Sequence, residues 1–312
     1  MITRNSYTKK LDLGQLSMSN EPPYDYLRGE EFRQYPDMQK IYELFSKKFG
    51  IPLNRFILTN GGENAVKNTL LALKPKNLLY SVPTWEMIDV FCEALDIIPI
   101  KNNLIYSKKA KSIIESVSEG KYGKVDCFYS CFHYNNLTGY ESSQDYTYSG
   151  AKYNILDATY TFPSYLECCS DDNTIVIGSF DKLFGVGLRL GFVIFPEELN
   201  VKFQLQREQF INHSAYKFLE WICHKNINML RSNMLLESRE KLFFMLDFVP
   251  RKRLYCCNYT GNYFTILGEV KELKNKKEFY IGDQLFTRIG VPANEEQMKE
   301  VLHALSILKQ DN

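Results

Sequence analysis

A single lysine in a glycine-containing loop is the first residue of this sequence that suggests chemistry. Lys182 lies in "GSFDKLFGVGLRLGF" (178–192), between an apolar run that ends at Ser179 and another that begins after Arg189. Residues that follow the strands of an open α/β sheet meet at the edge where such folds bind ligands. The sequence therefore singles out Lys182 and its two polar neighbours as members of a candidate site.

A glycine pair after an earlier apolar run is a candidate anion site. The segment "TNGGEN" (59–64) closes a strand-like run and opens an amphipathic stretch. The amides of four residues at this turn can point at an anion with the helix dipole behind them: Gly61, Gly62, Glu63 and Asn64. The Gly-Lys-Ser/Thr ending of a P-loop is missing. A turn that binds nothing is the alternative interpretation.

Other strand-like runs also end in polar or aromatic residues. Trp85 follows one of them, and its flat face can cover an aromatic ligand. Asp157 ends a strongly apolar run, where a carboxylate is costly unless it is paired, and Tyr160 follows three residues later. Asn135 and Asn136 in "HYNNLTGY" are residues that ordinarily form turns. Taken alone, each also has a structural explanation, such as a core tryptophan or a turn asparagine.

Alternating strand and helix patterns must position these residues. Strand-like apolar runs lie at 55–60, 77–83, 96–100, 125–132, 153–160, 173–180 and 190–196, with amphipathic stretches between several of them. This alternation is typical of βαβ units. The sequence predicts an α/β protein with a mostly parallel, seven-stranded sheet flanked by helices.

The pattern changes near residue 200, which predicts a second domain. Long helices are expected over 200–210 and 217–246, strands over 262–268 and 285–291, and a closing helix over 294–308. We expect an N-terminal arm (1–30) that packs on the small domain and a dimer partner. A large ligand-binding domain (31–210) and a smaller α+β domain (211–312) follow.

Composition excludes several classes of partner. The 38 Lys and Arg residues against 37 Asp and Glu residues leave a net charge of +1, which gives no electrostatic case for nucleic acid or a membrane surface. No segment has the roughly 20 apolar residues of a membrane span, and no signal peptide is apparent, so we expect a cytoplasmic protein. The eight cysteines lack the spacing of zinc knuckles, so no metal is expected.

The motifs form a familiar order. Along the chain come "LTNGGENA", "VPTWEM", "NNLTG", "DATY" and the lysine loop. This order resembles the pyridoxal-phosphate enzymes of the aspartate aminotransferase fold (fold type I, class I/II), and within them the histidinol-phosphate aminotransferase-like branch. The resemblance extends from "SNEPPY" near the N-terminus to "LFTRIGVPANEEQ" near the C-terminus.

The resemblance implies a role for each residue around the cofactor ring. Lys182 would form the Schiff base with the aldehyde of pyridoxal 5'-phosphate, and Asp157 would pair with the pyridine nitrogen and keep it protonated. Tyr160 and Asn136 would hydrogen-bond the ring hydroxyl oxygen. Trp85 would lie against the ring face.

The resemblance also assigns the phosphate, the substrate and a partner. The phosphate would take the amides of Gly61, Gly62, Glu63 and Asn64, with Ser179 and Arg189. Tyr35 of "YPD" would reach the phosphate of the partner subunit, which implies a homodimer. The substrate would contact Asn20, Asn136 and Arg288, whose planar guanidinium suits an α-carboxylate.

Several positions depart from the family pattern. His133, Tyr134 and Leu137 stand where Asn, Pro and Pro are common, and Asp181 replaces the usual serine before the lysine. Arg189 follows the lysine by seven residues, one fewer than the common spacing. A carboxylate beside Lys182 would favour the charged amine, so Asp181 either points away or the amine is tuned by another group.

The implied activity is transamination of an amino acid or an amino-alcohol phosphate. Decarboxylation or lysis of a similar (phospho-)amino acid needs almost the same residues, because the bond held perpendicular to the ring decides which bond breaks. A non-catalytic relative that binds a partner is a third alternative.

Overall fold

The computed structural model describes residues 35–107, 112–114, 117, 121–139, 147–161, 173–184, 187–258, 263–273, 276–292 and 294–310. Its helices are α1 (Met38–Phe49), α2 (Gly62–Leu73), α3 (Met87–Ala94), α4 (Phe180–Phe184), α5 (Asn200–Gln204), α6 (His213–Cys223), α7 (Ile227–Leu246) and α8 (Glu295–Gln310). Short 3-10 turns lie at Leu53–Arg55 and Glu197–Leu199. The predicted arm, 1–30, lies outside the described residues.

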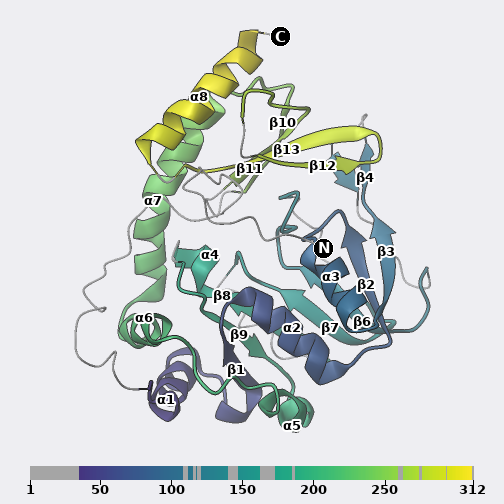
Figure 1. Ribbon diagram of the computed structural model, residues 1–312, viewed down its shortest axis with the longest axis vertical. Helices are drawn as coiled ribbons and strands as arrows, with labels where there is room; N and C mark the ends of the chain where they lie inside the picture. Colours follow the sequence, from purple (N-terminus) through teal and green to yellow (C-terminus); the bar gives the residue numbers. More distant parts are fainter. Residues whose placement is uncertain are drawn as a thin grey trace.

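A seven-stranded sheet forms the larger part of the molecule (Figure 1). Its strands are β1 (Phe56–Thr59), β2 (Asn77–Val82), β3 (Ile98–Asn103), β6 (Val125–Cys131), β7 (Ala151–Asp157), β8 (Thr174–Ser179) and β9 (Gly191–Ile194). Their order is β1-β9-β8-β7-β6-β2-β3, and only β9 runs antiparallel to its neighbours. The prediction of a mostly parallel α/β sheet is confirmed, and each of the seven expected runs overlaps one strand, although β3 and β7 extend beyond the expected bounds.

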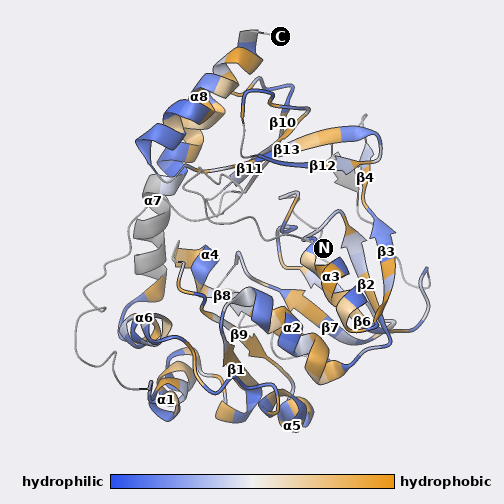
Figure 2. Ribbon diagram, viewed as in Figure 1, coloured by the Kyte–Doolittle hydropathy of each residue, from blue (hydrophilic) through white to orange (hydrophobic). Residues whose placement is uncertain are grey.

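Both faces of this sheet are buried under helices. In β1, Phe56 and Leu58 join the core beneath α1 and α6, while Ile57 between them joins the core beneath α2, α3 and α5. This alternation follows from the two-residue period of a strand. Figure 2 shows the corresponding apolar colouring of the strands and of the faces of α2 and α3 beside them. A sheet covered on both sides leaves its strand ends as the place for a site.

A smaller antiparallel sheet has the order β10-β11-β13-β12. Its strands are β10 (Leu254–Asn258), β11 (Tyr263–Leu267), β12 (Lys277–Ile281) and β13 (Gln284–Gly290). Leu242 of α7 and Leu305 of α8 pack with Phe264 and Ile289 in one core. Phe286 of β13 packs instead with Leu104 of the large part. In Figure 1, α7 extends from beside α6 to beside α8 and so connects the two parts. The predicted domain limits near residue 210 stay a prediction.

Two helices expected from the sequence are wrong in extent. The helix expected over 200–210 ends at Gln204, because the chain turns away and brings the Glu208 carboxylate to Asn60. The helix expected over 217–246 is interrupted between α6 and α7. There the amide of Lys225 bonds the carbonyl of Ile222, and Lys48 Nζ takes the carbonyl of Lys225 at 2.6 Å. Tertiary contacts override the helical pattern in both places.

Several elements have no counterpart in the expectations. They are α1, the two-stranded sheet of β4 (Ile105–Ser107) and β5 (Ser112–Ile114), and the strands β10 and β12 of the small sheet. Helix α1 has clear local signals, with Asp37 accepting from the Lys40 amide at its start and Gly50 at φ 69° after its end. No helix in the described part of the chain combines the length and apolar character of a membrane span.

Candidate functional site

The carboxyl ends of three parallel strands bring the central polar residues together. In register, Cys131 at the end of β6 lies beside Asp157 at the end of β7, and Asp157 lies beside Ile177 of β8. Lys182 lies in α4, which begins directly after β8. The sheet thus places Asp157 and the lysine helix on adjacent strand ends, as the sequence predicts.

The carboxylate of Asp157 is almost fully buried and accepts hydrogen bonds on both oxygens. Oδ2 accepts from the Tyr129 hydroxyl at 2.5 Å and from Asn136 Nδ2 at 2.6 Å. Oδ1 accepts from the Thr159 amide at 3.0 Å and from the Thr159 hydroxyl. We call these four residues, Asp157, Asn136, Tyr129 and Thr159, the Asp157 cluster. Donors on both oxygens stabilise a charged carboxylate despite its 3% exposure.

Two features of the Asp157 cluster bear on ligand binding. Burial, followed by the nearby Asp157 charge, raises the pKa of Tyr129 well above its usual value, so this hydroxyl stays a hydrogen-bond donor. Oδ1 of Asn136 is buried and has no hydrogen-bond partner among the described residues. A buried acceptor without a donor is costly, so a ligand that supplies one is favoured here.

The loop around Asn136 is held by the small sheet. Arg288 Nη1 of β13 donates to the carbonyl of Asn136 at 2.6 Å, and its guanidinium lies 4.6 Å from the ring centre of Tyr263. The Tyr263 hydroxyl donates to the carbonyl of Asn135 at 3.1 Å. Asn135 in turn accepts from the amides of Leu137 and Thr138, forming the turn that its type predicts. Arg288 and Asn136, both predicted to contact substrate, therefore lie together.

Tyr160 and Trp85 are the two aromatic residues predicted to contact the cofactor. Tyr160 is buried and packs edge-on against Tyr263, with ring centres 5.9 Å apart. Its burial raises the pKa of the hydroxyl, although the nearby Arg288 acts in the opposite direction. Trp85 follows β2, is partly buried and packs edge-on against Phe91. Tyr263 was not singled out from the sequence.

The start of α2 forms a second cluster. The N-cap residue Gly61, at φ 88°, has no side chain to cap the helix, whereas α1 and α6 are capped by Asp37 and Asn212. The first amides of α2 therefore remain available to an anion. A Cβ added to Gly62 would lie 3.3 Å from Cβ of Ser179 and 3.7 Å from the Thr159 hydroxyl. This close approach places the glycine turn, Ser179 and the Asp157 cluster side by side.

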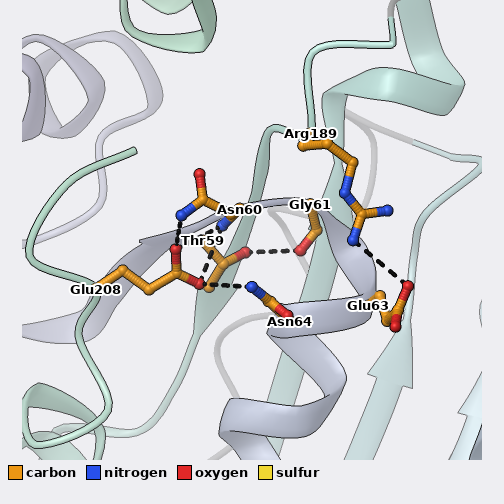
Figure 3. Close-up of polar contacts among 7 residues, drawn as sticks. All are labelled: Thr59, Asn60, Gly61, Glu63, Asn64, Arg189 and Glu208. Atoms are coloured by element: carbon orange, nitrogen blue, oxygen red, sulfur yellow. Dashed lines mark hydrogen bonds and ion pairs between the residues drawn. The ribbon is translucent and has the colours of Figure 1, made fainter. Parts of the chain in front are cut away.

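Figure 3 shows the charged groups at this turn. On one side of Gly61, Nη2 of Arg189 lies 3.4 Å from a carboxylate oxygen of Glu63, and a Cβ on Gly61 would lie 3.1 Å from Cζ of Arg189. We call Arg189, Glu63 and Gly61 the Arg189 cluster. On the other side, Glu208 accepts from the Asn60 amide and from Asn64 Nδ2, each at 3.1 Å. The Asn64 side chain is therefore directed at Glu208.

The lysine loop is closed by Asp181. Its carboxylate accepts from the amide of Leu190 at 3.2 Å, across the loop that separates Lys182 from Arg189. Burial raises the pKa of Asp181 to about 6, although the Leu190 amide and Lys182 lower it. Arg189 adopts φ 56°, in the left-handed region that residues other than glycine rarely occupy. Asp181 thus has a structural partner across the loop.

Tyr35, predicted to reach the phosphate of a partner subunit, is 82% exposed and stacks on Phe210 with ring centres 4.6 Å apart. Asn20 lies outside the described residues.

Sequence reasoning did not identify Tyr129, Thr159 or Glu208. Tyr129 was accessible in principle, since it lies two residues before Cys131, the register partner of Asp157, and so faces the same side of the sheet. Thr159 lies between Asp157 and Tyr160 in "DATY" and is a common partner of an aspartate two residues earlier. Glu208 had no local signal, because it lies 148 residues from Asn60.

Sequence comparison gives no relative of this chain. No model of a known protein family matches it, and no curated protein sequence does. Similarity appears only at the level of three-dimensional structure.

Solved structures share the architecture over nearly the whole chain. The histidinol-phosphate aminotransferase from Clostridium acetobutylicum matches with a TM-score of 0.75 and 15% identity, covering 97% of this chain and 100% of that one. The aspartate aminotransferase from Thermotoga maritima matches with a TM-score of 0.72 and 18% identity, covering 96% and 91%. L-threonine-O-3-phosphate decarboxylase from Porphyromonas gingivalis matches with a TM-score of 0.67 and 17% identity, covering 89% and 91%. The chain therefore has the fold that these two aminotransferases and this decarboxylase share.

Proposed function

We propose that the chain is a pyridoxal-phosphate-dependent aminotransferase that acts on an amino acid or an amino-alcohol phosphate. The observation that carries the proposal is the Asp157 cluster. A buried carboxylate held by donors on both oxygens lies on the strand next to the one that leads into Lys182. Such a carboxylate can pair with a protonated ring nitrogen, and a lysine beside it can bind an aldehyde.

The described residues fit the cofactor at both ends. At the ring end, the buried Oδ1 of Asn136 has no donor among the described residues, and a cofactor hydroxyl would satisfy it. At the phosphate end, the uncapped start of α2, Ser179 and Arg189 form a cradle that a Cβ on Gly61 or Gly62 would fill. The Thr159 hydroxyl joins the two ends, since it bonds Asp157 and would lie 3.7 Å from a Cβ on Gly62.

The protein supplies binding and proton transfer, and the bound cofactor supplies an electron sink for the substrate. In our proposal, Asp157 holds the ring nitrogen proton, and Tyr160 and Asn136 hold the ring hydroxyl oxygen. Trp85 would pack on the cofactor ring. The Nζ of Lys182 would accept a proton from the substrate Cα and later give it back.

Substrate orientation is assigned to the small sheet. Arg288 is 8% exposed, and its hydrogen bond to the Asn136 carbonyl uses Nη1. A guanidinium has five N–H donors, so further donors of Arg288 would bind and orient an α-carboxylate of the substrate. A carboxylate held in this way would be retained while the Cα proton is removed, which favours transamination. Asn20 of the predicted arm completes this part of the proposal.

Replacement of Lys182 tests the proposal directly. We expect Lys182→Ala to abolish turnover, by more than about a thousandfold, because both the aldehyde link and the proton carrier are lost. The fold should be retained, since Lys182 is only partly buried. Visible absorbance after addition of pyridoxal phosphate, borohydride reduction and peptide mapping at residue 182 provide the measurement. Retained turnover in this variant would refute the assignment.

Decarboxylation is the second candidate, supported by the likeness to the Porphyromonas gingivalis decarboxylase. An orientation of the substrate by Arg288 that favours loss of the carboxylate over loss of the Cα proton would direct the chain to that reaction. A screen of amino acids and phosphorylated amines should change the spectrum of the bound cofactor in the aminotransferase case. Carbon dioxide release without a keto acid would establish the decarboxylase instead. A chain that gives no absorbance with pyridoxal phosphate would be a non-catalytic relative.

We also infer a homodimer in the cytoplasm. The 82% exposure of Tyr35 leaves this side chain available to the phosphate of a partner subunit. Mixing an inactive Lys182→Ala chain with an inactive Tyr35→Phe chain should restore part of the activity if the two residues belong to different subunits.

A further inference from the structure

We propose that Glu63 competes with the cofactor phosphate for Arg189, so that this carboxylate sets the affinity of the chain for pyridoxal phosphate. The inference rests on the proposed function, because it concerns the same phosphate end. It assigns to the Glu63 side chain a role opposed to that of its backbone amide. The amide belongs to the helix start that attracts an anion, while the carboxylate is itself an anion at that place.

The first support is geometric. Nη2 of Arg189 lies 3.4 Å from Oε2 of Glu63, with 55% of the arginine side chain and 29% of the glutamate side chain exposed. The same guanidinium packs over Gly61, the N-cap residue of α2, whose own amide donates to the carbonyl of Thr59 at 2.9 Å. In Figure 3, Arg189 lies beside Gly61 and reaches towards Glu63. The arginine assigned to the phosphate is therefore already paired with a carboxylate.

The second support is the balance of charge. Glu63 is the acidic residue of the first turn of α2, where the helix dipole stabilises a negative charge. Glu208 adds a second carboxylate on the other side of Gly61 through Asn60 and Asn64. Among the contacts described at this turn, two carboxylates face one guanidinium. A phosphate dianion that enters this turn would therefore meet two carboxylates beside the guanidinium of Arg189.

The energetic consequence follows from what binding changes. The phosphate gains Arg189 only if the Glu63 contact is broken, and an unpaired Glu63 would then remain beside a dianion. An exposed ion pair is weak, so displacement is achievable but costs affinity. Glu208 differs, because it is bonded to a backbone amide and two side-chain amides and is not paired with Arg189. Glu63 is therefore the residue whose charge limits binding.

Glu63→Gln is the test variant, since it keeps the backbone amide and the side-chain shape and removes the charge. The purified full chain is freed of cofactor and titrated with pyridoxal phosphate, and separately with pyridoxal, which lacks the phosphate. We expect the variant to bind pyridoxal phosphate roughly three- to tenfold more tightly and pyridoxal equally well. A role of Glu63 in stability alone would change both affinities together.

Two further variants separate the charge effect from general effects. Glu93→Gln makes the same change in net charge at an exposed position near the end of α3, and should leave both affinities unchanged. In an Arg189→Gln background, the gain from Glu63→Gln should become smaller, because the contested guanidinium is gone. Raising the salt concentration should reduce the difference in affinity for pyridoxal phosphate between wild type and Glu63→Gln, because salt screens the charge of Glu63.

Inorganic phosphate makes the outcome independent of the proposed function. Stabilisation of the cofactor-free chain by phosphate, measured by thermal unfolding, should require less phosphate in Glu63→Gln than in wild type. The inference would be overturned if Glu63→Gln bound pyridoxal phosphate and inorganic phosphate no more tightly than wild type does. Absence of cofactor absorbance in every variant would contradict the proposed function. The measurement with inorganic phosphate would still decide the role of Glu63.

Discussion

The Asp157 cluster and the Arg189 cluster lie at the same sheet edge but are built in opposite ways. Asp157 is 3% exposed, and both of its carboxylate oxygens accept hydrogen bonds from the chain itself. Those from Tyr129, Asn136 and the Thr159 amide are 2.5 to 3.0 Å long. Arg189 is exposed, and Nη2 of its guanidinium lies 3.4 Å from Oε2 of Glu63. The first cluster is preorganised before any ligand arrives, and the second must exchange one partner for another.

This difference shows where each energetic effect belongs. Groups in the Asp157 cluster were desolvated when the chain folded, so changes there should act mainly on folding stability. The charged side chains of the Arg189 cluster remain hydrated, so changes to these side chains should act mainly on ligand binding. Three variants of the cofactor-free chain probe the Asp157 cluster, the backbone at Gly61 and Asp181 beside the lysine, in order of decreasing effect.

Asp157→Ala should have the largest effect. Removal of the carboxylate leaves the buried donors of Tyr129, Asn136 and Thr159 without their acceptor, so the free energy of unfolding should fall by about 3 kcal/mol. Urea unfolding of the cofactor-free chain measures this loss. Tyr129→Phe, which removes one donor and keeps the carboxylate, should lose only about 1 kcal/mol. A cofactor-free Asp157→Ala chain as stable as wild type would remove the contrast between the clusters.

Gly61→Ala should have an intermediate effect. At φ 88° and ψ 167°, a residue other than glycine is strained, so we expect a loss of about 2 kcal/mol in unfolding free energy. The new Cβ would also lie 3.1 Å from Cζ of Arg189 and push the guanidinium aside. Gly187→Ala is the control, because its Cβ would meet no atom within 4 Å. Unfolding curves that coincide for the two variants would show that the turn at Gly61 is not strained.

Asp181→Asn should have the smallest effect and a distinctive pH dependence. Burial raises the pKa of Asp181 from 3.8 to about 6, so the folded chain holds this proton more tightly than the unfolded chain. The wild type should therefore lose stability as pH rises from about 4 to about 6, and remain less stable above that range. Asparagine keeps an acceptor for the Leu190 amide without the charge.

The measurement is urea unfolding of both chains at several pH values. A rise in pKa from 3.8 to about 6 corresponds to about 3 kcal/mol for a fully buried group, and solvent reduces this figure at the partly exposed Asp181. Asp181→Asn should therefore be about 1 kcal/mol more stable than wild type above pH 6, and the difference should vanish near pH 4. Stability curves that run parallel over this whole range would exclude burial as the cause of the shifted pKa.

Much of the large sheet could be predicted from the sequence because most of its strands are buried on both faces; the edge strand β3 is largely exposed. Buried strands appear as short continuous apolar runs, and each of the seven runs overlaps a strand of the sheet. The small sheet was harder, because β12, "KEFYI", begins with two charged residues and follows a charged segment, so that it resembles a solvated surface. The end of α5 was missed because the contact between Glu208 and Asn60 is a long-range one.

The candidate site shows the same limit. Residues at strand ends, such as Asp157 and Lys182, were identifiable because a parallel sheet brings strand ends together. The groups that hold them were not, since Tyr129 and Asp181 act through contacts that depend on register and loop closure. The aspartate at position 181, where serine is usual in the family, has a structural role in the hydrogen bond that its carboxylate accepts from the Leu190 amide.

The hydrogen bond from Arg288 to the Asn136 carbonyl has a mechanical consequence. Asn136 is attached through its backbone to the small sheet and through its side chain to Asp157 of the large sheet. A rotation of the small sheet that moves Arg288 must therefore pull on the same residue that contacts the buried carboxylate. Asn136 is thus a direct link between the two sheets, and a movement of Arg288 relative to the large sheet would be transmitted to Asp157 through this one residue.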